Sequence, residues 1–192
     1  MPAKKKDKRA IKTQRQIKEA LAELLTKKEL RNITVQEISD KADVHRVTFY
    51  KHYYDIFDLY DKMEQELLSD FGLMILKFQN DYSEEVGKEF IEYIKENKIF
   101  FKMVFSPYNT GELLQKMTKI IEGSFRIFQS EQNEVKFHSD RLEYLSTCWA
   151  NICVAILGKW VNSDFEQSND SISKLVVEFE EVMNQLIAKE NN

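Results

Sequence analysis

The chain has 192 residues, of which 43% are hydrophobic and 31% charged, so a sizeable core can form and global disorder is excluded. It contains only two prolines and five glycines, which favours an all-α protein. The net charge of −4 hides an asymmetry: residues 1–53 hold 14 Lys and Arg against 7 Asp and Glu, whereas residues 54–192 hold 14 against 25. A basic N-terminal third followed by an acidic remainder fits a DNA-facing head on a body that does not contact DNA.

Cysteine usage and hydropathy indicate the compartment. Cys148 and Cys153 lie five residues apart in an apolar stretch and form neither a C-x-x-C pair nor a disulfide framework, which favours a reducing environment. The basic N-terminus is not followed by an apolar run, so no signal peptide is expected, and no apolar segment is long enough to span a bilayer. We therefore expect a cytoplasmic protein that does not contact a membrane.

The first elements are a basic arm and a helix. Residues 1–9 have no hydrophobic pattern and are expected to be a tail that orders along phosphates or in a minor groove when DNA is bound. Residues 11–28 carry Ile17, Leu21 and Leu25 at helical spacing, which predicts a helix that closes a three-helix core. Residues 30–32 are the expected connector.

Residues 34–53 predict two short helices joined by a tight turn. Val35, Ile38 and Ala42 form one apolar stripe at helical spacing, and Thr34 with Glu37 has the spacing of a capping box. Asp43 stands where a left-handed residue would turn the chain, a conformation that Asp tolerates.

The second short helix is expected to begin near His45. Its inward residues would be Val44, Phe49 and Tyr53, which leaves basic and polar side chains for solvent. This pattern is typical of a helix-turn-helix whose second helix reads the major groove. Spacing alone leaves an alternative open, namely a helical hairpin with a solvated polar face.

The same stretch resembles a known family. The run T-V-x-E-I-x-D-x-A-x-V-x-R-x-T-F-Y-x-H-Y, followed by D-I-F-D-L at residues 55–59, is similar to the DNA-binding domain of TetR/AcrR-family transcriptional regulators. The match extends from about Ala10 to Leu68. Three positions depart from the usual family pattern: Asp43 replaces Gly, Val47 replaces Gly or Ser, and Ile56 replaces Lys. Because of Val47 and Ile56, the family's base preference is not carried over.

The resemblance implies a DNA-binding domain at residues 10–54 and a helical regulatory and dimerisation domain at 55–192, with the linking helix starting at 55. Phosphate contacts are expected from Thr34, Tyr50 and His52, with Lys51 adding charge, and base contacts from Arg46 and Thr48. Two matched positions have open roles: His45 contacts bases or phosphates, and Val47 contacts a thymine methyl or nothing. For Tyr50 the alternative to a phosphate contact is packing within the head.

The body is predicted to be helical throughout. A long helix should start after Asp55 and continue as far as Phe78, with a break at 80–83. Further helices are expected at 84–97, 99–105 and 113–131, with a loop at 107–111. The last two helices, residues 141–162 and 172–188, are separated by a polar connector and are very apolar for the surface of a monomer. The family pairs its last two helices across a homodimer, so we expect this interface here.

The body is rich in aromatic and Met side chains, which fit either a plain core or an apolar ligand pocket, and we assign no ligand residue. These residues are Phe71, Met74, Phe78, Phe100, Phe101, Met103, Phe105, Phe125, Phe128 and Trp149. The chain has no nucleophile elbow, no phosphate-cradling glycine loop and no cluster with metal-ligand spacing. We therefore expect no catalytic residue, no metal, no cofactor and no enzymatic activity.

The predicted function is that of a sequence-specific regulator, more often a repressor in such families, that binds an inverted-repeat operator in double-stranded DNA as a homodimer. An effector bound in the C-terminal domain would release or retune it. The alternative is the same fold acting as an activator or adaptor, with a protein partner rather than a small molecule on its body.

Overall fold

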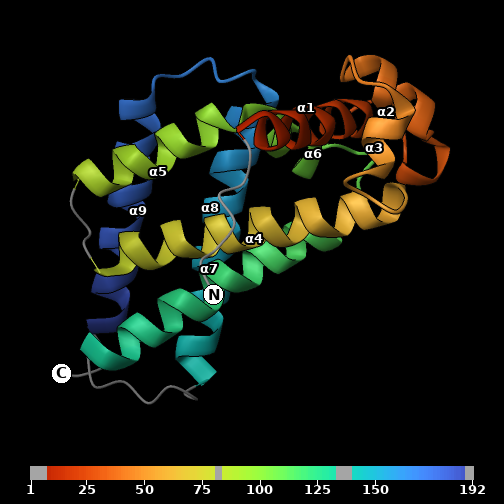
Figure 1. Cartoon of the computed structure of the whole chain (residues 1–192). Coiled ribbons are helices and arrows are strands. Elements are labelled where there is room, and N and C mark those ends of the chain that lie inside the picture. Colours follow the sequence, from red (N-terminus) through yellow and green to blue (C-terminus); the bar gives the residue numbers. More distant parts are fainter. Residues whose placement is uncertain (1–7, 81–83, 133–139, 189–192) are drawn as a thin grey trace. The chain divides into compact units, whose positions relative to one another are not determined.

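The structure, a computed structural model, describes residues 8–80, 84–132 and 140–188, with side chains for 8–77, 85–131 and 140–187 (Figure 1). These residues contain helices and no strand, which confirms the all-α prediction. In chain order the elements are α1 (Lys8–Leu25), η1 (Leu30–Asn32), α2 (Val35–Lys41), α3 (Arg46–Tyr50), α4 (Ile56–Asn80), α5 (Glu84–Glu96), α6 (Lys98–Val104), α7 (Glu112–Gln132), α8 (Asp140–Asn162) and α9 (Asn169–Ala188).

Packing divides the chain into two compact units. The first unit comprises Met1–Leu67 and Ile99–Gly111, and the second comprises Leu68–Lys98 and Glu112–Asn192. The division falls inside α4, later than the domain boundary expected after residue 54. It also places residues 99–111 with the N-terminal elements, where the Ser106 hydroxyl donates to the carbonyl of Leu25 at 3.0 Å.

The core of the first unit is built from one apolar stripe on each helix. Ile17 and Leu21 of α1, Ile38 of α2, Phe49 of α3 and Leu59 of α4 are all fully buried. The helix spacing predicted from residues 17–25 is confirmed, but α1 begins at Lys8, so the last two residues of the expected basic arm are helical. Residues 1–7 of that arm lie outside the described residues.

The predicted turn between the two short helices is confirmed. The Thr34 side chain accepts from the Glu37 amide, and the Glu37 carboxylate accepts from the Thr34 amide, so α2 begins with the expected capping box. Asp43 then adopts a positive φ of 53°, and α3 starts at once with His45 as its N-cap. The helix-turn-helix is thus formed by local side-chain and backbone preferences.

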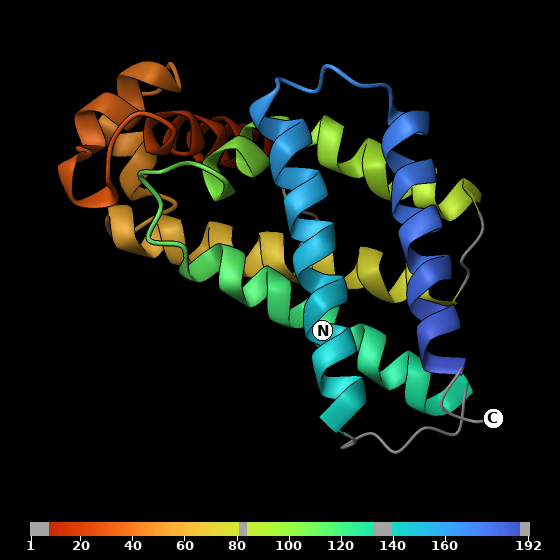
Figure 2. The same cartoon turned by 180° about the vertical axis from the view of Figure 1, so that it is seen from behind.

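The second unit is a bundle in which α7 packs on α8, α5 on α9, and α8 on α9 (Figure 2). Its helices start and end within three residues of the predicted positions. The largest difference is α9, which begins at Asn169 rather than at residue 172, because the Ser168 hydroxyl accepts from the Ser171 amide and caps the helix earlier. The break predicted at 80–83 falls largely on residues 81–83, outside the described residues.

The connector before α9 turns sharply. Asp164 and Phe165 both have positive φ values, and the Trp160 indole donates to the carbonyl of Gln167 at 2.9 Å. Phe165 also packs edge-on against the Trp160 ring, with centroids 4.9 Å apart. Trp160 therefore anchors the connector to α8. Within the described part of the chain, no helix has the length and apolarity required to cross a membrane.

Candidate nucleic-acid interface

The α3 helix has one buried and one exposed face. Phe49 is fully buried and Tyr53, just beyond the helix, is nearly so, which holds α3 against the core of the first unit. On the other side Arg46 and Lys51 are exposed, together with Val47 and Tyr50, whose exposed fractions are 57% and 52%. A cationic, partly apolar surface of this kind can contact phosphates, base edges and thymine methyl groups.

His45 has a structural role at the start of this face. Its Nδ1 accepts a hydrogen bond from the Val47 amide at 3.2 Å, which satisfies one of the free amides at the N-terminus of α3. The exposed ring therefore has Nε2 available as a donor, since Nδ1 is the acceptor. The expected contact of His45 with DNA would come from that atom.

Thr34 is exposed, but both of its polar groups already bind Glu37. Its amide and its hydroxyl each donate to the Glu37 carboxylate at 2.9 Å. Lys28 also pairs with this carboxylate, and the hydrogen bonds from Lys28 and then Thr34 lower the pKa of Glu37 to about 2. A phosphate near Thr34 would have to share these donors with Glu37.

Three of the expected contact residues are less free than the sequence suggested. Thr48 and His52 are half-buried, and the His52 Nδ1 lies 3.3 Å from the side-chain nitrogen of Gln14 in α1. Tyr50 packs edge-on against Phe49, with ring centroids 5.4 Å apart, while half of its side chain stays exposed. One edge of Tyr50 thus packs within the head, and the remainder is accessible for the expected phosphate contact.

Two exposed aromatic residues were not predicted from the sequence as site residues. Tyr54 is 86% exposed and Phe57 is 58% exposed, both at the start of α4. The Tyr54 amide donates to the Asp58 carboxylate at 2.9 Å, and the Asp58 amide donates to Asp55 at 2.8 Å, so the start of α4 is fixed by two acids. The sequence could have indicated them as two aromatic residues next to the acids that cap a helix, because polar residues are more usual at such surface positions.

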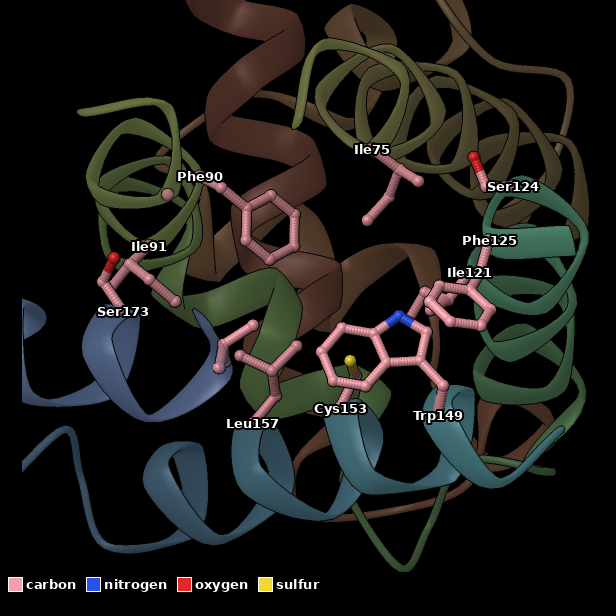
Figure 3. A pocket seen from close by; sticks show the side chains of 12 residues that line it. Ile75, Phe90, Ile91, Ile121, Ser124, Phe125, Trp149, Cys153, Leu157 and Ser173 are labelled. Atoms are coloured by element: carbon pink, nitrogen blue, oxygen red, sulfur yellow. The ribbon is translucent and has the colours of Figure 1, made fainter. Parts of the chain in front are cut away.

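The second unit contains an apolar pocket between five helices (Figure 3). In Figure 3 the rings of Phe90 from α5 and Trp149 from α8 face the same space, with Ile75 of α4 beside them. The lining residues come from α4, α5, α7, α8 and α9: Ile75, Gly87, Phe90, Ile91, Ile121, Ser124, Phe125, Trp149, Cys153, Leu157, Ser173 and Val176.

The sequence left open whether the aromatic and Met residues of the body form a core or a pocket, and the structure places some of them in each. Phe125 and Trp149 line the pocket, with ring centroids 5.7 Å apart. Phe71 is buried and packs on Phe90 but is not among the lining residues. Phe101 and Met103 are core residues of the other unit. The side chain of Phe78 lies outside the described residues.

The sequence of the chain is similar to those of known proteins. The TetR-type family model described as "Transcriptional regulator C-terminal region" matches residues 81–185, more than half of the chain. The HTH-type transcriptional regulator YxbF of Bacillus subtilis (strain 168) is 23% identical over 170 residues, which cover 85% of this chain and 43% of that protein. The chain thus spans less than half the length of this curated relative.

Solved structures share the fold. A transcriptional regulator of the TetR/AcrR family from Aquifex aeolicus VF5 superposes with a TM-score of 0.64 at 17% identity, covering 89% of this chain and 99% of that one. The dihydroxyacetone kinase operon activator DhaS gives a TM-score of 0.58 at 21% identity, covering 91% and 96%. At these identities the likeness is one of fold.

Proposed function

The chain belongs to the TetR family of transcriptional regulators, and we propose that it binds operator DNA as a homodimer through the exposed face of α3. This proposal rests on the two faces of α3. Phe49 is buried on one face, whereas the exposed side chains are those of Arg46, Val47, Tyr50 and, at the C-cap, Lys51. A core-anchored helix with a cationic outer face suits the major groove of B-DNA.

We propose that the dimer forms through α8 and α9. Three apolar side chains, Leu175, Phe179 and Val182, are exposed on α9 at steps of four and three residues, which places them on one helix face. On α8 the Tyr144 side chain is also largely exposed. Solvent-exposed apolar residues in a row are costly in a monomer and are typical of an interface that a second copy covers.

Regulation would use α4. This helix begins beside α3, contributes Leu59 to the core of the first unit, and carries Ile75 in the wall of the pocket in the second unit. A ligand that favours one position of α4 changes the population of DNA-binding states by no more than its difference in affinity between those states. We propose that an effector in the pocket releases the protein from its operator, so that the unliganded dimer is a repressor.

A second candidate is an activator whose body binds a protein partner. It is supported by the similar solved structure of DhaS, which is named an operon activator. In that case a partner, rather than a small molecule, would select the DNA-binding state. A reporter gene under the operator separates the two, because deletion of the regulator raises expression for a repressor and lowers it for an activator.

The test of DNA recognition is selection of bound sequences from random duplex DNA by the purified protein, at low and moderate salt. An inverted repeat with half-sites separated by about one helical turn is the expected outcome. Its affinity should fall steeply with salt, since bound Lys and Arg displace counterions from phosphates. Salt-sensitive binding without any consensus sequence would mean that α3 binds DNA only through its positive charge, which would contradict the proposal.

A further inference from the structure

His52 lies just beyond the C-terminus of α3, in a turn rather than in a helix. Its backbone is held by two hydrogen bonds: its own amide donates to the carbonyl of Phe49 at 2.9 Å, and the amide of Tyr53 donates to the same carbonyl at 3.0 Å. Phe49 and Tyr53 are both buried in the core of the first unit. The fold therefore fixes the backbone of His52, whereas the state of its ring depends on what the ring contacts.

The ring of His52 contacts Gln14, a residue of α1 that is 38 positions away in the sequence. The side-chain nitrogen of Gln14 lies 3.3 Å from Nδ1 of His52, and both residues are half-buried. An amide nitrogen can only donate a hydrogen bond, so Nδ1 is the acceptor and carries no proton. A neutral imidazole has one protonated nitrogen, which in this ring is Nε2.

His45, the N-cap of α3, has the same arrangement with a different donor. Its Nδ1 accepts from the backbone amide of Val47 at 3.2 Å. A backbone amide cannot exchange its nitrogen and oxygen by rotation, as a glutamine side chain can, so the donor at His45 is fixed. The histidines at the two ends of α3 thus share one tautomer, in which Nδ1 is bound within the protein and Nε2–H is a donor.

This tautomer is the one that a phosphate requires. Phosphate oxygens only accept hydrogen bonds, so a neutral histidine binds them through its protonated nitrogen. The two nitrogens lie on different edges of the imidazole, so with Nδ1 toward Gln14 the Nε2–H is directed away from it. With the proton on Nδ1 instead, the neutral ring of His52 would present a lone pair to the phosphate.

We propose that Gln14 is a positioning residue for operator binding, which holds His52 as a neutral ring whose Nε2–H donates to a DNA phosphate. Gln14 acts through His52 and makes no contact with DNA itself. The inference deepens the proposed function and rests on it for the phosphate contact. The tautomer is a property of the protein alone and is measured without DNA.

The first experiment locates the ring protons of the full chain in the absence of DNA. Long-range proton–nitrogen NMR spectra distinguish the two tautomers, and the chain has only three histidines to assign. His45 and His52 should both show a protonated Nε2 and a bare Nδ1. Gln14→Leu should leave His52 as a mixture of tautomers, and Gln14→Glu should move its proton to Nδ1, because a carboxylate only accepts.

The ring of His45 should not change in either variant, which makes it an internal control. A protonated Nδ1 on His52 in the unaltered chain overturns the proposal. A ring of His52 that does not respond to Gln14→Leu overturns it as well.

The second experiment measures affinity for an operator selected from random duplex DNA. Gln14→Leu should weaken binding about fivefold, and by the same factor at all sites, since a phosphate contact carries no sequence information. His52→Ala should weaken binding at least as much. Adding Gln14→Leu to His52→Ala should have no further effect, because Gln14 acts only through this ring.

The matched control is Gln16→Leu, which replaces another half-buried glutamine on a different side of α1 and should bind like the unaltered protein. Losses of Gln14→Leu and His52→Ala that multiply in the double variant would mean that the two residues act independently, and the positioning role would be wrong.

The two experiments separate this inference from the function on which it rests. The expected ring signals without any operator in the selection would overturn the DNA-binding function and leave Gln14 with a structural contact only. An operator that Gln14→Leu binds with unchanged affinity would preserve the DNA-binding function and overturn the role of Gln14.

Discussion

At the scale of single residues, we propose that the exposed face of α3 carries one side chain for base reading and another for phosphate binding. Arg46 and Tyr50 lie four residues apart and therefore on the same side of the helix. An Arg guanidinium can donate two hydrogen bonds to guanine, whereas a Tyr hydroxyl suits a phosphate oxygen. Tyr50 is also braced by Phe49, which limits the positions that its ring can take.

We predict that Arg46→Ala relaxes base preference at one position of each half-site by about 1–3 kcal/mol. Tyr50→Phe should instead weaken all sites alike, by about 1 kcal/mol, since it removes one hydrogen bond that carries no sequence information. Binding to a panel of single-base operator variants measures both. Arg31→Ala removes an exposed Arg elsewhere in the first unit and is the matched control. If Arg46→Ala weakened all sites alike and Tyr50→Phe relaxed base preference, Tyr50 would be the base-reading residue and Arg46 the phosphate-binding one.

The capping box of α2 predicts a dependence of stability on pH. The pKa of Glu37 falls to about 2 in the folded protein, from an ordinary value of 4.5, because Lys28 and Thr34 donate hydrogen bonds to its carboxylate. The ionised carboxylate therefore stabilises the fold at neutral pH, and this contribution is lost as the pH falls from about 4.5 to about 2.

Glu37→Gln should accordingly lower the melting temperature at pH 7 but have little effect near pH 2. The side chain is exposed to solvent, so the difference should be small and should shrink in high salt. Thermal unfolding of both proteins across this pH range is the measurement. A difference in melting temperature that stays constant with pH would mean that the charge of Glu37 does not stabilise α2.

At the scale of elements, the turn between α2 and α3 depends on one left-handed residue. Asp43 has φ of 53° and is exposed, so its conformation rather than its packing is important. A β-branched side chain is strained there, and we predict that Asp43→Val destabilises the protein by about 1–2 kcal/mol. Asp43→Gly, the matched control, should cost little, because glycine adopts positive φ without strain. Urea unfolding compares the two.

Asp43→Val should also weaken operator binding more than Asp43→Gly does, because a shifted turn would misplace α3 relative to α2. Equal stability of the two variants would show that the turn tolerates a side chain that is branched at Cβ, and the argument from backbone conformation would fail.

At the scale of the whole molecule, the proposed dimer depends on the outer face of α9. Val176 and Phe179 lie three residues apart on this helix, but the structure gives them different surroundings. Val176 faces inward and lines the pocket, whereas Phe179 is 39% exposed. A charge at Val176 would therefore disturb the fold, and only Phe179 gives a clean test of association.

Phe179→Glu should convert the dimer to monomers in sedimentation at micromolar concentration, because a carboxylate buried in an apolar interface has no partner. Lys174→Glu adds the same group at an exposed position of α9 outside the row formed by Leu175, Phe179 and Val182, and should remain dimeric. Phe179→Glu should also lose operator affinity, since each half-site would be bound independently. An unchanged dimer would remove α9 from the interface.

The sequence by itself determined the features that depend on local preferences. Helical spacing, the Thr34–Glu37 capping box and the left-handed Asp43 are properties of neighbouring residues, and the structure confirms each of them. The resemblance to TetR/AcrR regulators was drawn from a contiguous motif at residues 34–59, and it is confirmed by the family model that matches residues 81–185.

Only the tertiary structure decided which residues meet across long separations. The pocket combines Ile75, Phe90, Trp149 and Ser173 from four helices, and no spacing within one helix distinguishes such a wall from an ordinary core. Tertiary packing likewise placed residues 99–111 with the N-terminal unit and directed Val176 inward. Helical periodicity identifies an apolar face, but the surface that this face meets depends on how distant segments pack together.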